Sequence, residues 1–166
     1  MKQEIENLIR RQNDNAAKVK MHMSSTSSNL ALIRKIIVAS VKHLNFPKDI
    51  IEGLKLAVTE ACTNVIRHAH KYDDSKSFDI EMQGCNQAFI IEILYNDPGF
   101  DPTKIPVRDL SEVREGGYGV FLMHSIMDYV NYITDSETGD VRLQMVKLAT
   151  KQNCAESVGG SCENRS

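Results

Sequence analysis

Residues 57–69 read AVTEACTNVIRHA, and the rest of the chain can be interpreted outward from this stretch. Glu60, Asn64 and His68 recur at i, i+4 and i+8, so on a helix they form one polar stripe beside the apolar positions. A polar stripe next to an apolar face is costly to bury unless its members form hydrogen bonds. The spacing therefore indicates either a ligand site or an exposed polar helix edge.

Two consecutive amphipathic helices are predicted around this stretch. Apolar residues recur at helical spacing from Leu30 to Leu44, after a run of N-cap candidates at 24–29. A second pattern starts at about Pro47, a suitable first-turn proline, and continues to near His68. The polar stripe then lies in the second half of the second helix.

Alternation of apolar and polar residues predicts strands elsewhere, with turns at 84–86 and 135–140. The predicted strands span residues 18–24, 78–82, 89–93, 129–133 and 141–148. A polar stretch at 96–115, long enough for a functional lid, precedes a further helix through 120–126. This order predicts an α+β fold in which a mostly antiparallel sheet is covered by helices on one face. We expect an N-terminal extension at 1–17, one domain at 18–150 and a disordered tail at 151–166.

Composition excludes several classes of function. The 166 residues suffice for one core, and no apolar run approaches the roughly 20 residues of a membrane span. The start lacks a secretion signal, so we expect a cytoplasmic protein with free thiols. A net charge of -2 argues against direct nucleic-acid binding. The cysteines lack the C-x-x-C spacing of a zinc site: Cys62, Cys85, Cys154 and Cys162.

Two more clusters carry chemistry. Asn96-Asp97-Pro98-Gly99 follows a predicted strand, where the Asp97 carboxylate could accept the amino group of a base and Gly99 would let the backbone approach its ring. A simple turn has the same composition. Residues 115–120, EGGYGV, open directly into a helix, so their backbone amides could bind phosphate, although a flexible hinge is the alternative.

In this order the three clusters resemble the N, G1 and G2 boxes of the GHKL ATPase superfamily over roughly residues 18–148. Residues 57–69 and 117–128 are most similar to the anti-sigma-factor serine kinases. The resemblance implies a Bergerat fold, a two-layer α/β sandwich that binds ATP and Mg²⁺. It also implies that Glu60 is the general base, that Asn64 reaches Mg²⁺, that Asp97 binds adenine, and that Gly117 and Gly119 cradle phosphate. The full set of expected ATP-binding residues is Asn64, Arg67, His68, Asp97, Gly99, Gly116, Gly117, Tyr118, Gly119 and Val120.

Two positions depart from the family pattern. Arg114 stands where members carry a partner-contacting arginine, but Glu115 and Gly116 shift its register. Thr138-Gly139 reverses the usual Gly-Thr, whose hydroxyl supports the adenine site in the family. Partner contact by Arg114 is therefore a hypothesis, and the hydroxyl contact of Thr138 is left open.

The resemblance implies a kinase that phosphorylates a serine on a STAS-type antagonist and otherwise sequesters a sigma factor, as a homodimer. A nucleotide-holding module without phosphate transfer is one alternative. A detached histidine-kinase ATPase domain is another, although the stretch before residue 18 is too short for the usual phosphoacceptor hairpin. Val19, Met21 and Met23 on one strand face could lie in a dimer interface or at an internal sheet edge.

Overall fold

The computed structural model describes residues 2–11, 18–85, 88–105 and 118–149. Within these ranges five strands form one antiparallel sheet of order β1-β2-β3-β5-β4. The strands are β1 (Lys18–Ser24), β2 (Ser77–Cys85), β3 (Ala88–Asn96), β4 (Tyr129–Thr134) and β5 (Asp140–Leu148). The helices are α1 (Lys2–Arg11), α2 (Leu30–Val41), α3 (Lys48–Asn64) and α4 (Tyr118–Ile126). The predicted α+β class is confirmed.

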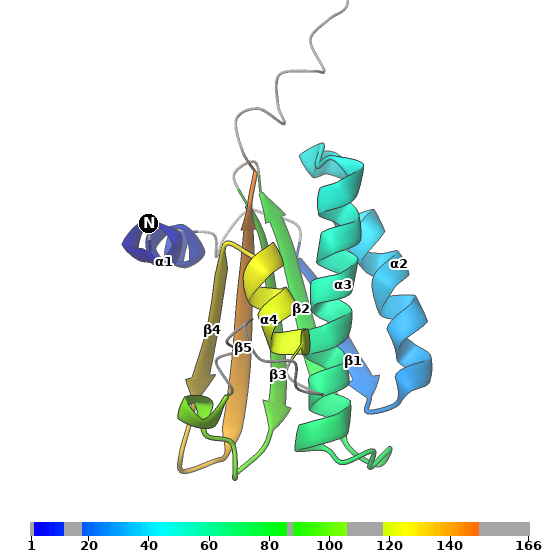
Figure 1. Ribbon diagram of the computed structural model, residues 1–166, viewed down its shortest axis with the longest axis vertical. Coiled ribbons are helices and arrows are strands. Elements are labelled where there is room, and N and C mark those ends of the chain that lie inside the picture. Colours follow the sequence, from blue (N-terminus) through cyan, green and yellow to red (C-terminus); the bar gives the residue numbers. More distant parts are fainter. Residues whose placement is uncertain (1, 12–17, 86–87, 106–117, 150–166) are drawn as a thin grey trace, which may run out of the picture.

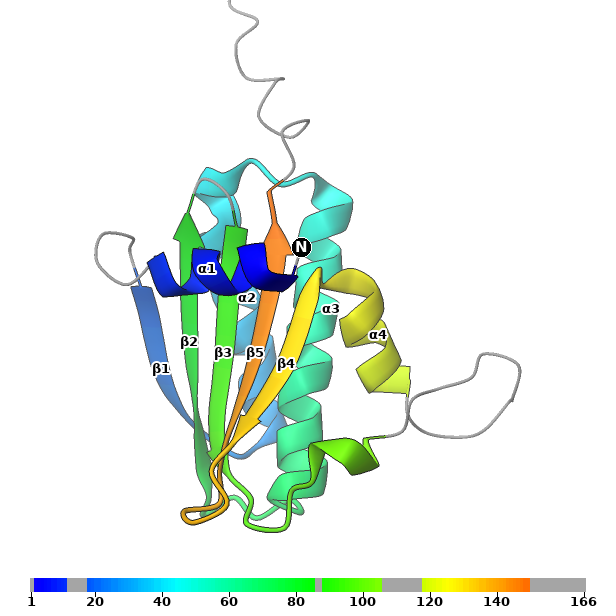
Figure 2. The same cartoon turned by 90° about the vertical axis from the view of Figure 1, so that its left-hand side faces the viewer.

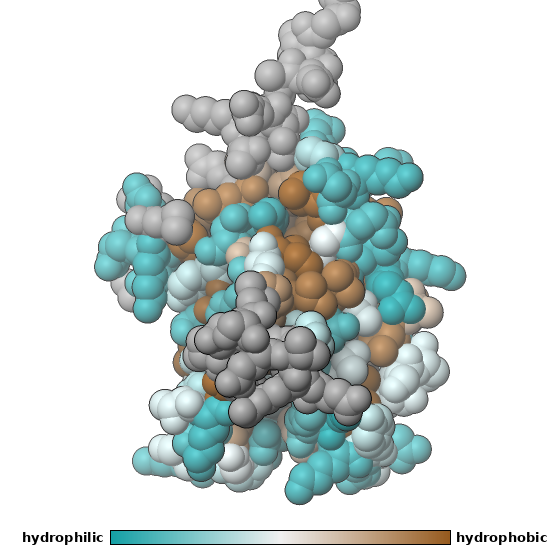
Figure 3. Space-filling view, in the orientation of Figure 1, coloured by the Kyte–Doolittle hydropathy of each residue, from teal (hydrophilic) through white to brown (hydrophobic). Residues whose placement is uncertain are grey.

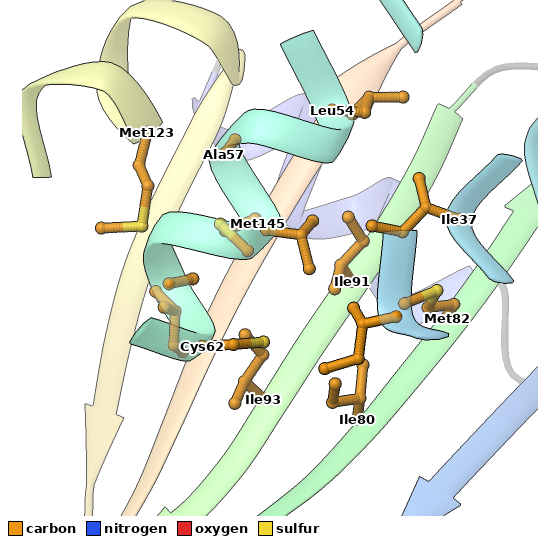
Figure 4. Packing of buried hydrophobic residues seen from close by; sticks show 14 of the residues in the cluster. Ile37, Leu54, Ala57, Cys62, Ile80, Met82, Ile91, Ile93, Met123 and Met145 are labelled. Atoms are coloured by element: carbon orange, nitrogen blue, oxygen red, sulfur yellow. The ribbon is translucent and has the colours of Figure 1, made fainter. Parts of the chain in front are cut away.

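Helices α2, α3 and α4 lie on one face of the sheet, as the sequence predicts (Figure 1). The core fills the space between them, with Leu54 and Ala57 of α3 facing Ile91 of β3 and Met145 of β5 (Figure 4). Each of these four residues is 0% exposed, so each is fully removed from water. Burying such a side chain contributes about 1.5–3 kcal/mol of transfer free energy. This core fixes α3 against the sheet.

Helix α1 lies on the opposite face of the sheet, across the strands (Figure 2). Its Ile5 is 3% exposed and packs in a second, small cluster with Ala88 and Ile90 of β3 and Val146 of β5. The sequence analysis left residues 1–17 as an uninterpreted extension, so this helix is a new finding. The sheet is therefore partly covered on its second face as well.

Helix ends differ from the sequence prediction in three places. Pro47 occupies the N-cap of α3 rather than its first turn, since the helix begins at Lys48. Helix α3 ends at Asn64, and the chain continues as a π-helical turn, Val65–Ala69, where an uninterrupted α-helix to about His68 was expected. At the start of α2, Asn29 makes no side-chain cap bond and instead donates Nδ2 to the backbone oxygen of Ser24, 2.9 Å away.

Strand β1 forms one edge of the sheet. Met23 is buried and Met21 is partly buried against the main core, whereas Val19 on the same face is 36% exposed. The two methionines fit an internal sheet edge, and the dimer-interface alternative stays a prediction.

The face that carries α3 and α4 shows hydrophobic patches among hydrophilic residues (Figure 3). Among the helices of the described residues, none combines the length and the apolar character that a membrane crossing requires.

Candidate active site

A hollow of about 630 Å³ lies between the end of α3, the segment after β3 and the start of α4. Its volume is in the range of small-molecule sites, about 300–1,000 Å³. The described residues that the sequence predicted for a site all line it: Glu60, Asn64, Arg67, His68, Asp97, Gly99, Tyr118, Gly119 and Val120. The fold therefore brings together three clusters that are far apart in the sequence.

Glu60 and Asn64 lie one turn apart on α3 and are both half-buried. The carboxylate of Glu60 extends to Gly119 at the start of α4, and a Cβ added at Gly119 would stand only 2.6 Å from Glu60 Oε2. A glycine is thus required there if the carboxylate is to keep this position. The contact places a potential general base beside the first turn of α4, whose backbone N–H groups favour an anion.

The π-helical turn places Arg67 and His68 at the exposed rim of the hollow. It is closed by the backbone N–H of His70, which donates to the oxygen of Val65 over 2.9 Å. Such i to i+5 turns widen a helix and are frequent at functional sites. Both rim side chains can therefore meet a ligand from the solvent side.

Asp97 is half-buried just after β3, and its backbone oxygen accepts the N–H of Phe100 at 3.0 Å in a tight turn. Among the residues that the structure describes, a Cβ at Gly99 would meet only Asp97 Oδ1, at an ordinary 3.8 Å. The protein's own atoms thus leave space beside Gly99, which agrees with close approach of a ligand to this backbone.

Three aromatic residues that the sequence analysis did not assign to the site also line the hollow. Phe100 lies between Tyr95 and Tyr132, with ring centroids 6.3 Å and 5.1 Å away. Burial raises the pKa of Tyr132 to about 12, so its hydroxyl stays neutral. The hollow therefore has an apolar wall beside the Asp97 carboxylate, as a planar heterocyclic base requires. The sequence pointed to this wall only through Tyr132, which shares the inward face of its predicted strand with Val130.

His70 supports this segment from inside the core. It is 2% exposed, and its Nδ1 lies 2.9 Å from Ser25 Oγ. Burial, and secondarily the charge of Lys76, lower its pKa below the usual 6.5. Weaker influences that raise the pKa come from Asp97, Asp73 and a hydrogen bond with the backbone of Asn96. His70 is therefore neutral at pH 7 and is tied to the end of β3.

Comparison with known proteins agrees with this arrangement of motifs. The family model described as the histidine kinase-like ATPase domain matches residues 23–147. A serine-protein kinase RsbW from Halalkalibacterium halodurans is 30% identical over 153 residues, covering 86% of this chain and 90% of that protein. The chain belongs to the histidine kinase-like ATPase domain family, and within it to the relatives of the serine-protein kinase RsbW.

Other members of the family are similarly related. The serine-protein kinase RsbW of Oceanobacillus iheyensis is 32% identical over 68% of this chain and 76% of its own, and that of Bacillus subtilis is 29% identical over 70% and 78%. A crystal structure of RsbU and RsbW domains from Mycobacterium tuberculosis matches with a TM-score of 0.58 at 10% identity, over 81% of this chain and 33% of that one. The last match shows the shared fold.

Membership of an ATPase family implies ATP binding, and the donor set of the hollow fits a nucleotide: a carboxylate beside an aromatic wall for the base and a helix start for phosphate. Within the described residues, no three His, Cys, Asp or Glu side chains gather to hold a metal ion. Mg²⁺ typically takes one or two protein ligands plus phosphate oxygens and water. A site in which Asn64 is the one protein ligand and phosphate oxygens supply the others would therefore suit Mg²⁺.

Some predicted positions remain untested. Arg114, Gly116 and Gly117 lie outside the described residues. Thr138 is described, and its hydroxyl accepts the backbone N–H of Asp140 at 3.2 Å within the β4–β5 turn. Thr138 does not line the hollow, so its hydroxyl serves the turn rather than the base pocket.

A larger hollow, about 860 Å³, is lined by the start of β2, the ends of β3 and β4, the β4–β5 turn and the start of β5. Some of its charged groups are paired, since His22 Nδ1 lies 2.6 Å from Asp79 Oδ1 and Arg142 lies 3.4 Å from Glu92. It contains none of the three sequence clusters except Asn96. The smaller hollow is therefore the better candidate for the active site, because residues of all three sequence clusters line it.

Proposed function

We propose that this chain, a serine kinase by family, transfers the γ-phosphoryl group of ATP to a serine on a small antagonist domain of the STAS type. In the alternate state the same kinase would sequester a sigma factor. The observation that carries the kinase chemistry is the position of Glu60, whose carboxylate reaches the start of α4 inside the hollow that Asp97 also lines.

Each side chain then has one task. Asp97 accepts a hydrogen bond from the amino group of adenine, and the apolar wall of Phe100 and Tyr132 contacts its ring. Backbone N–H groups at the start of α4 hold phosphate oxygens, and Arg67 adds positive charge at the rim. Glu60 accepts the proton of the attacking serine hydroxyl. Mg²⁺, held by Asn64 and phosphate, would neutralise charge on the β- and γ-phosphates.

The proposed roles separate binding from transfer. Glu60→Ala should slow phosphoryl transfer by about 10²- to 10⁴-fold, the usual contribution of a general base, and leave ATP affinity within about twofold, because the carboxylate acts on the hydroxyl. Asp97→Asn should weaken ATP affinity, and Asn64→Ala should remove the magnesium dependence of binding. Titration calorimetry with ATP and ADP, with and without Mg²⁺, measures the binding.

Transfer is measured with radiolabelled ATP and purified STAS domains, each beside its serine-to-alanine variant as the control. Label that appears only on the serine form supports the proposal. ATP binding without transfer to any STAS domain would instead favour the nucleotide-holding module. Equal loss of ATP affinity in Glu60→Ala and Asp97→Asn would contradict the division of roles.

Homodimerisation is part of the same proposal. The inward direction of Met21 and Met23 leaves the exposed side of β1 and its edge as candidate contacts. Sedimentation equilibrium at several protein concentrations distinguishes a dimer from a monomer.

A further inference from the structure

The turn between β4 and β5 touches the active-site segment through its backbone. The N–H of Asp97 donates to the oxygen of Gly139 at 2.8 Å. Asn96 Nδ2 donates to the backbone oxygen of Thr138 at 2.9 Å and to Asp140 Oδ1 at 3.0 Å. Three hydrogen bonds thus join two consecutive residues of the site segment to three consecutive residues of the turn.

Gly139 meets this segment more closely than any residue with a side chain could. Its φ is +75°, which L side chains rarely adopt. A Cβ at this position would stand 2.7 Å from Pro98 Cγ and 2.8 Å from Pro98 Cα. Because Cα belongs to the backbone and the proline ring is rigid, no side-chain rotation could relieve the contact, and the backbone of the Asp97-Pro98 segment or of the turn would have to shift.

The turn itself is firmly held. Asp135 Oδ1 accepts the N–H groups of Glu137 at 2.8 Å and Thr138 at 3.2 Å, and the N–H of Gly139 donates to the oxygen of Asp135 at 2.8 Å. A turn with this many internal bonds moves as a unit, so it can act as a rigid support.

We propose that the 135–140 turn positions Asp97, with Gly139 as the positioning residue, and that the preference of the site for adenine depends on this contact. The inference rests on the proposed bond between Asp97 and the amino group of adenine. It predicts that a substitution outside the hollow, at a residue that does not line it, changes the discrimination between bases.

The experiment compares two ligands by titration calorimetry: ATP, and purine riboside triphosphate, which lacks only the 6-amino group. A hydrogen bond to a charged group is worth a preference of about tenfold or more. We expect the full chain to prefer ATP by about this factor and Asp97→Ala to lose the preference. Gly139→Ala should lose most of it too, through weaker ATP binding, while the affinity for the analogue stays within about twofold.

Three further variants sharpen the result. Gly139→Asn tolerates positive φ but carries the same Cβ, so contact with Pro98 predicts that it also loses the preference. Asn96→Ala removes two of the three bridging bonds without adding atoms. If circular dichroism shows that the Gly139 variants fold poorly, the base preference of Asn96→Ala is the test of the positioning role. Glu137→Ala changes an exposed side chain of the same turn and should behave as the unmodified chain.

An unchanged preference in Gly139→Ala and in Asn96→Ala, with Asp97→Ala showing a loss, would overturn the positioning role alone. Equal weakening of both ligands in these variants would also overturn it, since that indicates only general destabilisation. An unchanged preference in Asp97→Ala would instead overturn the proposed adenine contact itself.

Discussion

Glu60 can lie against α4 only because residue 119 has no side chain. In Gly119→Ala the new Cβ would stand 2.6 Å from Glu60 Oε2, closer than any real contact, so the carboxylate must rotate away. We expect phosphoryl transfer to slow by about 100-fold, the lower range for losing a general base. Single-turnover transfer of radiolabelled phosphate measures this rate.

The control is the double variant with Glu60→Gln. If Gly119 acts through Glu60, the double variant is no slower than Glu60→Gln alone, because residues that act as a unit are not additive. Two losses that multiply would show that Gly119 acts independently of the carboxylate.

Among single residues, those whose residue type and local spacing suggest a site could be predicted from the sequence to line the hollow. Glu60, Asn64 and Asp97 belong to this group, since a carboxylate or amide at helical spacing or after a strand carries its chemistry with it. Phe100 and Tyr132 do not, because their rings meet only after β3 and β4 are placed in the sheet. The support from Gly139 was missed for the same reason.

Among the elements, β1 was predicted to the residue and β4 and β5 to within one residue, whereas β2 and β3 extend up to three residues beyond the predicted 78–82 and 89–93. The end of β3 was harder to predict because β3 is buried on both faces for much of its length, so its residues do not alternate strictly. Helix α1 was missed although its apolar residues, Ile5, Leu8 and Ile9, have helical spacing. The rest of α1 is polar, so it gains burial only by docking on a sheet face that the sequence did not show to be available. The π-helical turn after Asn64 was missed because the local spacing fits an ordinary α-helix, and His70, which closes the turn, is held by Ser25, a residue far away in the sequence.

The docking of α1 can be tested separately from the core. Ile5→Ala should remove hydrogen-exchange protection from the amides of α1, because Ile5 is the buried residue of this helix, and lower the melting temperature only slightly. Leu54→Ala, in the main core, should cost about 2–5 kcal/mol of unfolding free energy and is the matched comparison. Loss of protection throughout the sheet in Ile5→Ala would contradict an independently docked helix.

For the molecule as a whole, stability should decrease with acidity through His70. Its pKa is lowered in the folded state, so below pH 6.5 the unfolded chain binds more protons than the folded one. The stabilisation is complete above about pH 6.5 and is lost as the pH falls toward the folded pKa. Urea unfolding at pH 7.5 and 5.5 measures it, and His70→Gln should show a smaller difference between the two. An equal difference in both proteins would assign the pH dependence to other groups.

The pairing of β3 with β5 has a consequence for the order in which the protein matures. Asn96 pairs with Asp140, so the support for Asp97 forms only after a segment of more than forty residues has closed. Such long-range pairings form slowly. A chain without β5 in place would have α3 and its polar stripe, but Asp97 would lack the bond of its N–H to Gly139. ATP would therefore bind the native fold in preference to earlier intermediates. A higher ATP concentration would then stabilise the native state against unfolding.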